Sequence, residues 1–147
     1  MTYQHIFVPI DGSETSLAAV DKAAEFAKAF NAKITVVQVM ALDPYIAAEY
    51  ISAAQTNDMI ERARHAILDD LATAKARFSQ LDVEVETKLL EGQVVHRELI
   101  NAAQELGADL IIIGSHGRTG LKKLFLGSVA QNVLSEVHIP VLIIRHP

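Results

Sequence analysis

Apolar and polar positions follow two different periods along this chain. Short runs rich in β-branched residues predict strands, and apolar residues three or four positions apart predict amphipathic helices. The predicted strands cover residues 5–10, 33–40, 83–89, 109–113 and 141–144. The predicted helices lie between them, over residues 17–30, 60–78, 95–106 and 128–137. Strand 83–89 alternates apolar and charged residues, which is typical of a half-exposed edge strand. Strand 109–113 is apolar and predicts burial on both faces.

Turn and cap residues indicate where these elements begin and end. We expect Ser13 and Ser128 to cap the first and the last helix. Gly107 ends the helix before strand 109–113. Residues 41–57 show weak periodicity and are interrupted by Pro44. We therefore interpret them as a long connecting excursion with one helical turn at most.

The order of the elements predicts the fold class. Strands separated by crossover helices form a parallel sheet with helices on both faces, so the chain is predicted to be a single doubly wound α/β domain over residues 1–147. Such sheets bind ligands beyond the carboxyl ends of their strands, where the strand order reverses. The segments that follow the first and the fourth strand are therefore the places to look for function.

Composition limits the function classes. The 147 residues are 50% hydrophobic and 21% charged, which is globular usage. The absence of cysteine excludes disulfides and thiolate metal sites. Thirteen basic and eighteen acidic residues give a net charge of −5, which is unfavourable for nucleic-acid binding. Without a signal-peptide pattern or an apolar run near the roughly 20 residues of a membrane helix, a soluble cytoplasmic protein is expected.

A glycine-rich segment follows the fourth predicted strand. Gly114 and Gly117 allow close approach of the backbone to a ligand, and Gly127 with Ser128 opens a helix whose N-terminus favours an anion. Arg118 adds positive charge. These features describe a phosphate cradle, and they equally describe a plain surface loop in which Ser128 caps a helix. The P-loop motif GxxxxGK[ST] and the dinucleotide motif GxGxxG are both absent.

The spacing of these glycines resembles a known family. Gly114-x2-Gly117-x9-Gly127-Ser128 is similar to the G-x2-G-x9-G-[ST] signature of the nucleotide-binding universal stress proteins. The resemblance extends to VPIDGSE after the first strand, to GSHGRTG and LGSVAQNVL in the glycine segment and its helix, and to IPVLIIR at the end. It implies a sheet of order 3-2-1-4-5, ATP as the bound ligand, with or without Mg²⁺, and a homodimer that forms through the last strand, Val141–Arg145.

The resemblance also implies a set of nucleotide-binding residues. One group faces the adenosine moiety, the next lines the ribose and phosphate path, and the last presents backbone N–H groups, with one hydroxyl, to the phosphates. In that order they are Pro9, Asp11 and the backbone of Val39; Gly114, His116, Gly117 and Arg118; and Gly127, Ser128 and Val129. Without the resemblance, the sequence favours a turn role for Asp11 over a ligand contact.

The function hypothesis is an ATP-binding module of the stress response or of signalling. Phosphoryl transfer needs a positioned base and, as a rule, metal-binding carboxylates, whereas the predicted pocket offers Asp11 and His116 alone. We therefore expect no catalytic residue. No HxxxH pair occurs among the histidines, so no zinc site is expected either. A slow ATPase on the same fold and a nucleotide-free structural dimer remain the alternatives.

Overall fold

One parallel sheet organises the chain, as the sequence predicts. The computed structural model describes residues 2–42, 52–116 and 126–145. Its five strands lie in the order β3-β2-β1-β4-β5, and every pairing is parallel. The strands are β1 His5–Pro9, β2 Lys33–Ala41, β3 Val85–Gly92, β4 Leu110–Gly114 and β5 Val141–Ile144. The predicted fold class and strand order are confirmed.

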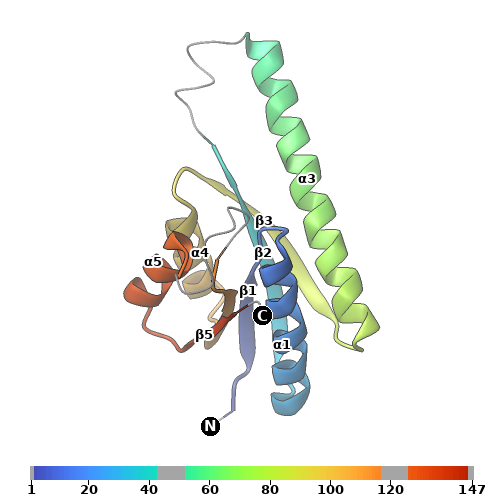
Figure 1. Ribbon diagram of the computed structural model, residues 1–147, viewed down its shortest axis with the longest axis vertical. Coiled ribbons are helices and arrows are strands. Elements are labelled where there is room, and N and C mark those ends of the chain that lie inside the picture. The colour runs from blue at the N-terminus through green and yellow to red at the C-terminus, as the bar shows by residue number, and fades with distance from the viewer. Residues whose placement is uncertain (1, 43–51, 117–125, 146–147) are drawn as a thin grey trace.

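Helices cover both faces of the sheet (Figure 1). They are α1 Glu14–Phe30, α3 Ala53–Gln80, α4 Val95–Glu105 and α5 Ser128–Glu136. The helices α1 and α3 pack on one face, and α4 and α5 on the other. Figure 1 also shows the N-terminal half of α3 extending well beyond the ends of the strands. Within the described ranges, no helix has both the length and the hydropathy needed to cross a membrane.

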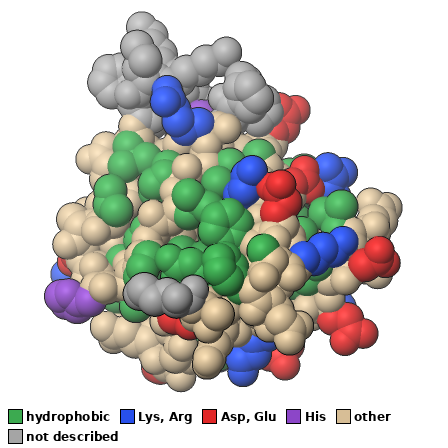
Figure 2. All heavy atoms as spheres, turned by 90° about the horizontal axis from the view of Figure 1, so that it is seen from below, with side chains coloured by type: hydrophobic (Ala, Val, Ile, Leu, Met, Phe, Trp, Pro, Cys, Tyr) green, Lys and Arg blue, Asp and Glu red, His purple; other side chains and the backbone are tan. Residues whose placement is uncertain are grey.

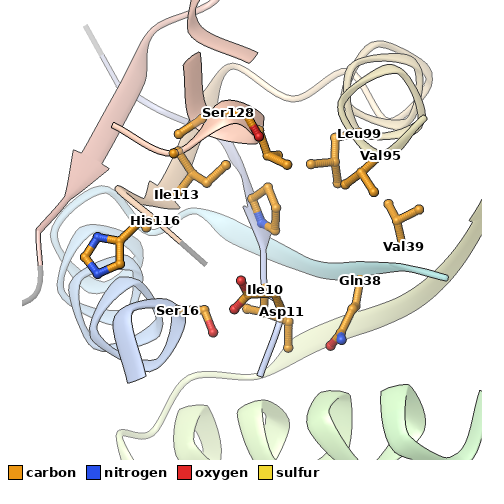
Figure 3. A pocket seen from close by; sticks show the side chains of 15 residues that line it. Ile10, Asp11, Ser16, Gln38, Val39, Val95, Leu99, Ile113, His116 and Ser128 are labelled. Atoms are coloured by element: carbon orange, nitrogen blue, oxygen red, sulfur yellow. The ribbon is translucent and has the colours of Figure 1, made fainter. Parts of the chain in front are cut away.

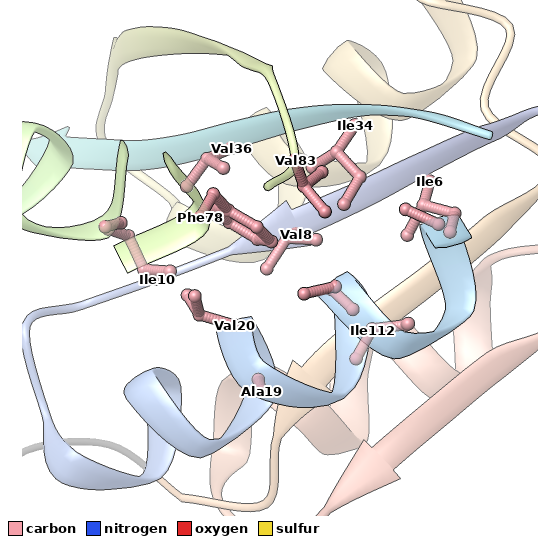
Figure 4. Close-up of a cluster of buried hydrophobic side chains, with 14 of the residues drawn as sticks. Ile6, Val8, Ile10, Ala19, Val20, Ile34, Val36, Phe78, Val83 and Ile112 are labelled. Carbon is pink, nitrogen blue, oxygen red and sulfur yellow. The ribbon is translucent and has the colours of Figure 1, made fainter. Parts of the chain in front are cut away.

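Successive side chains of the central strand β1 point to opposite faces of the sheet, and this divides the core into two parts. Ile6 and Val8 of β1 point to the face covered by α1 and α3, where they lie in one cluster with Phe78 (Figure 4). Phe7 points to the opposite face, toward α4 and α5. All four side chains are fully buried. Burying a side chain of this size contributes roughly 1.5–3 kcal/mol, so both layers hold the strand in place and fix where it ends.

The N-cap of α1 is the residue that the sequence predicts, whereas the N-cap of α5 is a different residue. The Ser13 hydroxyl accepts a hydrogen bond from the Ser16 N–H at 3.2 Å, which confirms Ser13 as the N-cap. At α5 the N-cap is Gly127, and Ser128 is already the first helical residue. The expected cap at Ser128 is therefore wrong. Because Gly127 has no side chain, the first N–H groups of α5 receive no side-chain cap.

The predicted excursion over residues 41–57 is shorter in the structure at both ends. The strand β2 continues to Ala41, and α3 begins at Ala53, so residues 53–57 are helical. Ser52 and Gln55 form a capping box in which each side chain bonds the backbone of the other. The pattern S-x-x-Q is present in the sequence and predicts this start. Residues 43–51, including Pro44, lie outside the described residues.

Candidate functional site

The strand order reverses between β1 and β4. The chain leaves β1 toward β2 on one side and leaves β4 toward β5 on the other, so the two connections diverge at the carboxyl ends of neighbouring strands. A cavity of about 350 Å³ opens at this point. This volume falls in the range of small-molecule sites. The topology therefore forms a ligand-sized hollow where a doubly wound sheet is expected to have one.

The cavity brings together most of the residues that the sequence singled out. Eight of the ten line it, and Figure 3 shows several of them around it. They are Pro9, Asp11, Val39, Gly114, His116, Gly127, Ser128 and Val129. The other two, Gly117 and Arg118, lie outside the described residues. Proximity to the cavity is thus established for eight residues, while their contacts with a nucleotide stay predictions.

Sequence reasoning missed the remainder of the wall. Most of these residues are apolar and come from the end of β1, β4, α4 and α5, where the sequence marks them as ordinary core. They are Ile10, Ser16, Gln38, Val95, Leu99, Ile113 and Ala130. Gln38 is the one that a sequence signal could have identified, because it is a polar residue inside the apolar run 34–40.

One end of the cavity is formed by the start of α5. Gly127 accepts the first intrahelical bond, from the Gln131 N–H at 2.9 Å, and donates its own N–H to the Ser115 carbonyl at 2.6 Å. The next N–H groups, of Ser128, Val129 and Ala130, have no partner within the helix, because they belong to its first turn and no helical carbonyl lies four residues before them. These three residues line the cavity. Their N–H groups and the helix dipole therefore favour an anion at this end.

Steric crowding explains why residue 127 is a glycine. A β-carbon there would lie 3.1 Å from the His116 Cα and 3.2 Å from the Ser115 carbonyl oxygen. A larger residue would push the start of α5 away from the end of β4. The close packing of these two segments keeps the N-terminus of α5 against the cavity.

Asp11 takes the turn role that the sequence also allowed. Its Oδ1 accepts a hydrogen bond from the Ser13 N–H at 2.9 Å, which fixes the turn before α1. Asp11 also lines the cavity. Since a carboxylate can accept several hydrogen bonds at its two oxygens, the turn role leaves acceptor capacity for a ligand hydroxyl or amine.

His116 lies between two hydroxyl groups. Its Nδ1 is 3.0 Å from the Ser115 Oγ, and its Nε2 is 3.5 Å from the Thr15 Oγ1. The first distance is a hydrogen bond, and the second is at the outer limit of one. In the described part of the chain, no three His, Asp or Glu side chains gather as metal ligands would. The ring is thus held at the cavity by neutral neighbours.

Comparison with known proteins agrees with this architecture. The model of the universal stress protein family matches residues 2–145. The chain belongs to the universal stress protein family. It is 34% identical over 146 residues to universal stress protein MJ0531 of Methanocaldococcus jannaschii, covering 99% of this chain and 84% of that relative.

Solved structures of the family share the fold. The structure of MJ0577, a universal stress protein of the same archaeon, superposes with a TM-score of 0.86 at 26% identity, over 100% of this chain and 99% of that one. A universal stress protein in complex with cAMP superposes with a TM-score of 0.71 at 28% identity, over 100% of both chains. A nucleotide ligand is therefore known for a family member of the same fold.

Proposed function

We propose that this universal stress protein binds an adenine nucleotide, ATP, in the cavity between β1 and β4 and acts as a nucleotide-dependent module of the stress response or of signalling. The observation that carries the proposal is the position of the α5 N-terminus. The N–H groups of Ser128 and Val129, which have no acceptor within the helix, line the same cavity as the apolar residues Val95 and Leu99. A phosphate group and a flat base need these two environments.

The backbone of β2 supports a place for the base. The Ile10 N–H donates to the Val37 carbonyl at 2.8 Å, so Val37 turns its polar backbone groups toward β1. In a parallel strand this direction repeats every second residue. The N–H and C=O of Val39 therefore point to the same side, beyond Pro9, where β1 has ended. The edge of a base can hydrogen-bond there.

The ligand of one relative supports the nucleotide class. The universal stress protein that was solved with cAMP has the same fold over its full length, and cAMP carries an adenine base and a phosphate. The N–H groups at the start of α5 support the same ligand class, because they favour an anion at the cavity. If the nucleotide carries Mg²⁺, Asp11 is the carboxylate that lines the cavity.

Ser128→Pro tests the phosphate cradle. Proline is tolerated at the first position of a helix, and Gly127, with φ −62° and ψ 156°, already has the conformation that a residue before proline prefers. The substitution removes one N–H and one hydroxyl, whereas Ser128→Ala removes the hydroxyl alone. We expect Ser128→Pro to bind ATP more weakly than Ser128→Ala, on the order of tenfold, by titration calorimetry.

Adenosine provides the matched ligand for this test. It lacks phosphates, so its affinity should be equal in the two variants. Equal ATP affinity in Ser128→Pro and Ser128→Ala would contradict a phosphate at α5. Absence of ATP binding by the unaltered protein, with no adenine nucleotide released on denaturation, would instead favour the nucleotide-free structural dimer.

The rate of ATP hydrolysis distinguishes a nucleotide-binding module from the alternative, an ATPase. A chemical step on the order of 1 s⁻¹ or faster in a single turnover with labelled ATP would place the protein among ordinary enzymes. We expect a much slower step, because Asp11 is the carboxylate of the described cavity wall and its Oδ1 is already engaged by the Ser13 N–H.

We also propose that the protein forms a homodimer through β5 and the residue that follows it, Val141–Arg145. The strand β5 lies at the edge of the sheet, and its four apolar residues are each only partly buried. An apolar strand with an open edge tends to pair with another chain. Hydrophobic side chains gather in the middle of the face of the molecule that is seen from below (Figure 2), so this protein exposes apolar surface there.

A further inference from the structure

Arg145 is an exposed cation at the carboxyl ends of the strands, where the cavity opens. It follows the last residue of β5, and its side chain is exposed. It forms no salt bridge with any other residue that the structure describes. A guanidinium group is planar and always charged, and it binds phosphate oxygens through two of its N–H groups. Its position relative to the start of α5 therefore decides whether it has a role in the proposed site.

Backbone hydrogen bonds hold Arg145 close to the start of α5. The Ser115 N–H donates to the Ile144 carbonyl at 2.7 Å, and the Ser115 carbonyl accepts from the Gly127 N–H at 2.6 Å. Ile144 and Gly127, the N-cap of α5, are thus each one hydrogen bond away from Ser115, and Arg145 directly follows Ile144. Neighbouring strands lie about 5 Å apart, which an extended arginine side chain can span.

The alternation of side chains along β5 indicates the face of the sheet to which Arg145 belongs. Val141 and Ile143 pack on the face covered by α4 and α5, whereas Leu142 and Ile144 pack on the face covered by α1 and α3. The Ile144 carbonyl is still hydrogen-bonded across the sheet, so the peptide that leads to Arg145 keeps the orientation of the strand. The next residue then belongs to the face of α5.

The two ends of the cavity differ in what they offer a nucleotide. Figure 3 shows His116, which follows Ser115, on the side of the cavity away from Val39. If the base lies at Val39, the phosphate chain extends toward His116 and the start of α5. The N–H groups of α5 hold one phosphate, and any further phosphate lies beyond it, toward the side where β5 ends.

We propose that the Arg145 guanidinium binds the phosphates beyond the first, so that the site selects nucleoside di- and triphosphates over monophosphates. The proposal rests on the nucleotide binding proposed above. ATP presents phosphate oxygens to both the α5 N–H groups and Arg145, and the hydrogen bonds from Arg145 are charge-assisted. AMP has a single phosphate, which α5 holds, and it leaves Arg145 without a partner.

A role of Arg145 in the proposed dimer has a different consequence. Arg145 ends the segment through which we propose that two copies pair, so its replacement can alter association. Altered association changes the affinities for ATP and for AMP by the same factor. The ratio of the two affinities separates these roles, because a general change in the site cancels from it.

The experiment measures the affinities of the full chain for ATP and for AMP by titration calorimetry. We expect the unaltered protein to prefer ATP. In Arg145→Gln, which keeps N–H donors without the charge, this preference should fall on the order of tenfold. In Arg145→Lys, which keeps the charge without the planar fork, it should fall less. Lys75→Gln removes one charge from an exposed position of α3 outside the cavity wall, and as the matched control it should keep the preference.

Each outcome bears on one claim. A preference that is unchanged in Arg145→Gln overturns the role of Arg145 while ATP binding stands. Equal affinities for ATP and AMP in the unaltered protein also overturn it, since the further phosphates then contact nothing. An equal loss of preference in Lys75→Gln would assign the effect to net charge and not to Arg145. If the unaltered protein binds neither nucleotide, the proposed function fails, and the role of Arg145 fails with it.

Discussion

Gly114 occupies a position where the smallest added side chain would collide with the first helix. A β-carbon there would lie 2.8 Å from the Thr15 Cγ2 and 3.3 Å from the Thr15 backbone. Thr15 is itself 4% exposed and has little room to move. The glycine therefore allows the end of β4 to pack against the start of α1, and the cavity mouth is formed where they meet.

We expect Gly114→Ala to lower the free energy of unfolding by about 1–3 kcal/mol, the usual cost of overpacking a closely packed contact. Urea unfolding followed by circular dichroism measures it. Combining the change with Thr15→Ser removes the methyl group at 2.8 Å, so the double variant should recover part of the loss. A double variant that loses the sum of both single effects would show that this contact is not the cause.

Asp11 shows what a motif can and cannot predict for a residue. The position after the first strand indicated two roles, a turn acid and a nucleotide contact. The structure shows the first, through the bond from the Ser13 N–H, and brings the residue to the cavity without deciding the second. The sequence carries no information on which oxygen faces the ligand, because that depends on how the turn packs.

At the scale of elements, an ion pair on the surface connects α1 and α3. The Arg77 Nε and Nη2 donate to the two oxygens of Asp21 at 2.7 and 2.8 Å. These hydrogen bonds hold the pKa of Asp21 below its ordinary value. Both side chains are nearly half exposed, at 49% and 43%, so the expected contribution to stability is modest.

The lowered pKa of Asp21 gives this contribution a definite pH dependence. In the unfolded chain Asp21 titrates near its ordinary pKa of about 3.9, and in the folded protein at a lower pKa. The stabilisation is therefore present above about pH 4 and is lost as the pH falls through the folded pKa. Asp21→Asn should lower the urea midpoint at neutral pH, and the difference from the unaltered protein should shrink in acid.

A second ion pair serves as the control for Asp21→Asn. Lys22 and Glu25 lie within α1, at 2.8 Å, and connect no two elements. Lys22→Gln removes this pair, and it should change the midpoint less than Asp21→Asn. If the effect of Asp21→Asn were the same at every pH, the charge of Asp21 would not be its source.

The elements with strong periodicity could be predicted from the sequence, and the weak ones could not. All five predicted strands have counterparts in the structure, and their order agrees with the one that the family resemblance implied. The start of α3 was missed because its first turns contact little of the core, and Ile67 is its first buried residue. Apolar periodicity arises from burial, so it cannot predict a helix end that projects from the core. The start of α3 could be predicted only from its cap at Ser52.

The residues of the cavity wall also fall into those that the sequence could predict and those that it could not. Glycines and the aspartate at strand ends could be predicted, since turns and close approaches need those residue types. The apolar wall from Val95 and Leu99 could not, because the same residues would serve equally well in a core. Gln38 needed the structure, because only Asp70, 32 positions away, determines how its amide is oriented.

At the scale of the whole molecule, a net charge of −5 has to be reconciled with an anionic ligand. Among the described residues that line the cavity there is no lysine or arginine, and the one basic side chain is His116. In the described cavity wall the favourable potential comes from backbone N–H groups and the dipole of α5, and we predict that Arg118 adds to it. Such a site acts at short range, and the affinity for ATP should depend less on salt than it does in sites built from surface lysines.

The proposed association of two copies also belongs to the scale of the whole molecule. In β5, Ile143 pairs with Ile113 of β4 on one side, and the other side of the strand is the edge of the sheet. A second copy of β5 can extend the sheet there and cover the apolar side chains. A lysine at this edge opposes such pairing, since a charge would be buried in the contact.

We expect Ile143→Lys to weaken the homodimer by at least about tenfold in its dissociation constant, measured by sedimentation equilibrium. Leu68→Lys is the matched control, because Leu68 is 48% exposed on α3, away from β5. Thermal unfolding must show that Ile143→Lys is folded, since the side chain packs partly against the core. A dimer that persists in folded Ile143→Lys and dissociates in Leu68→Lys would move the interface to α3. If the unaltered protein is a monomer at every concentration, the open edge of β5 is protected by the chain itself, and the sheet ends there.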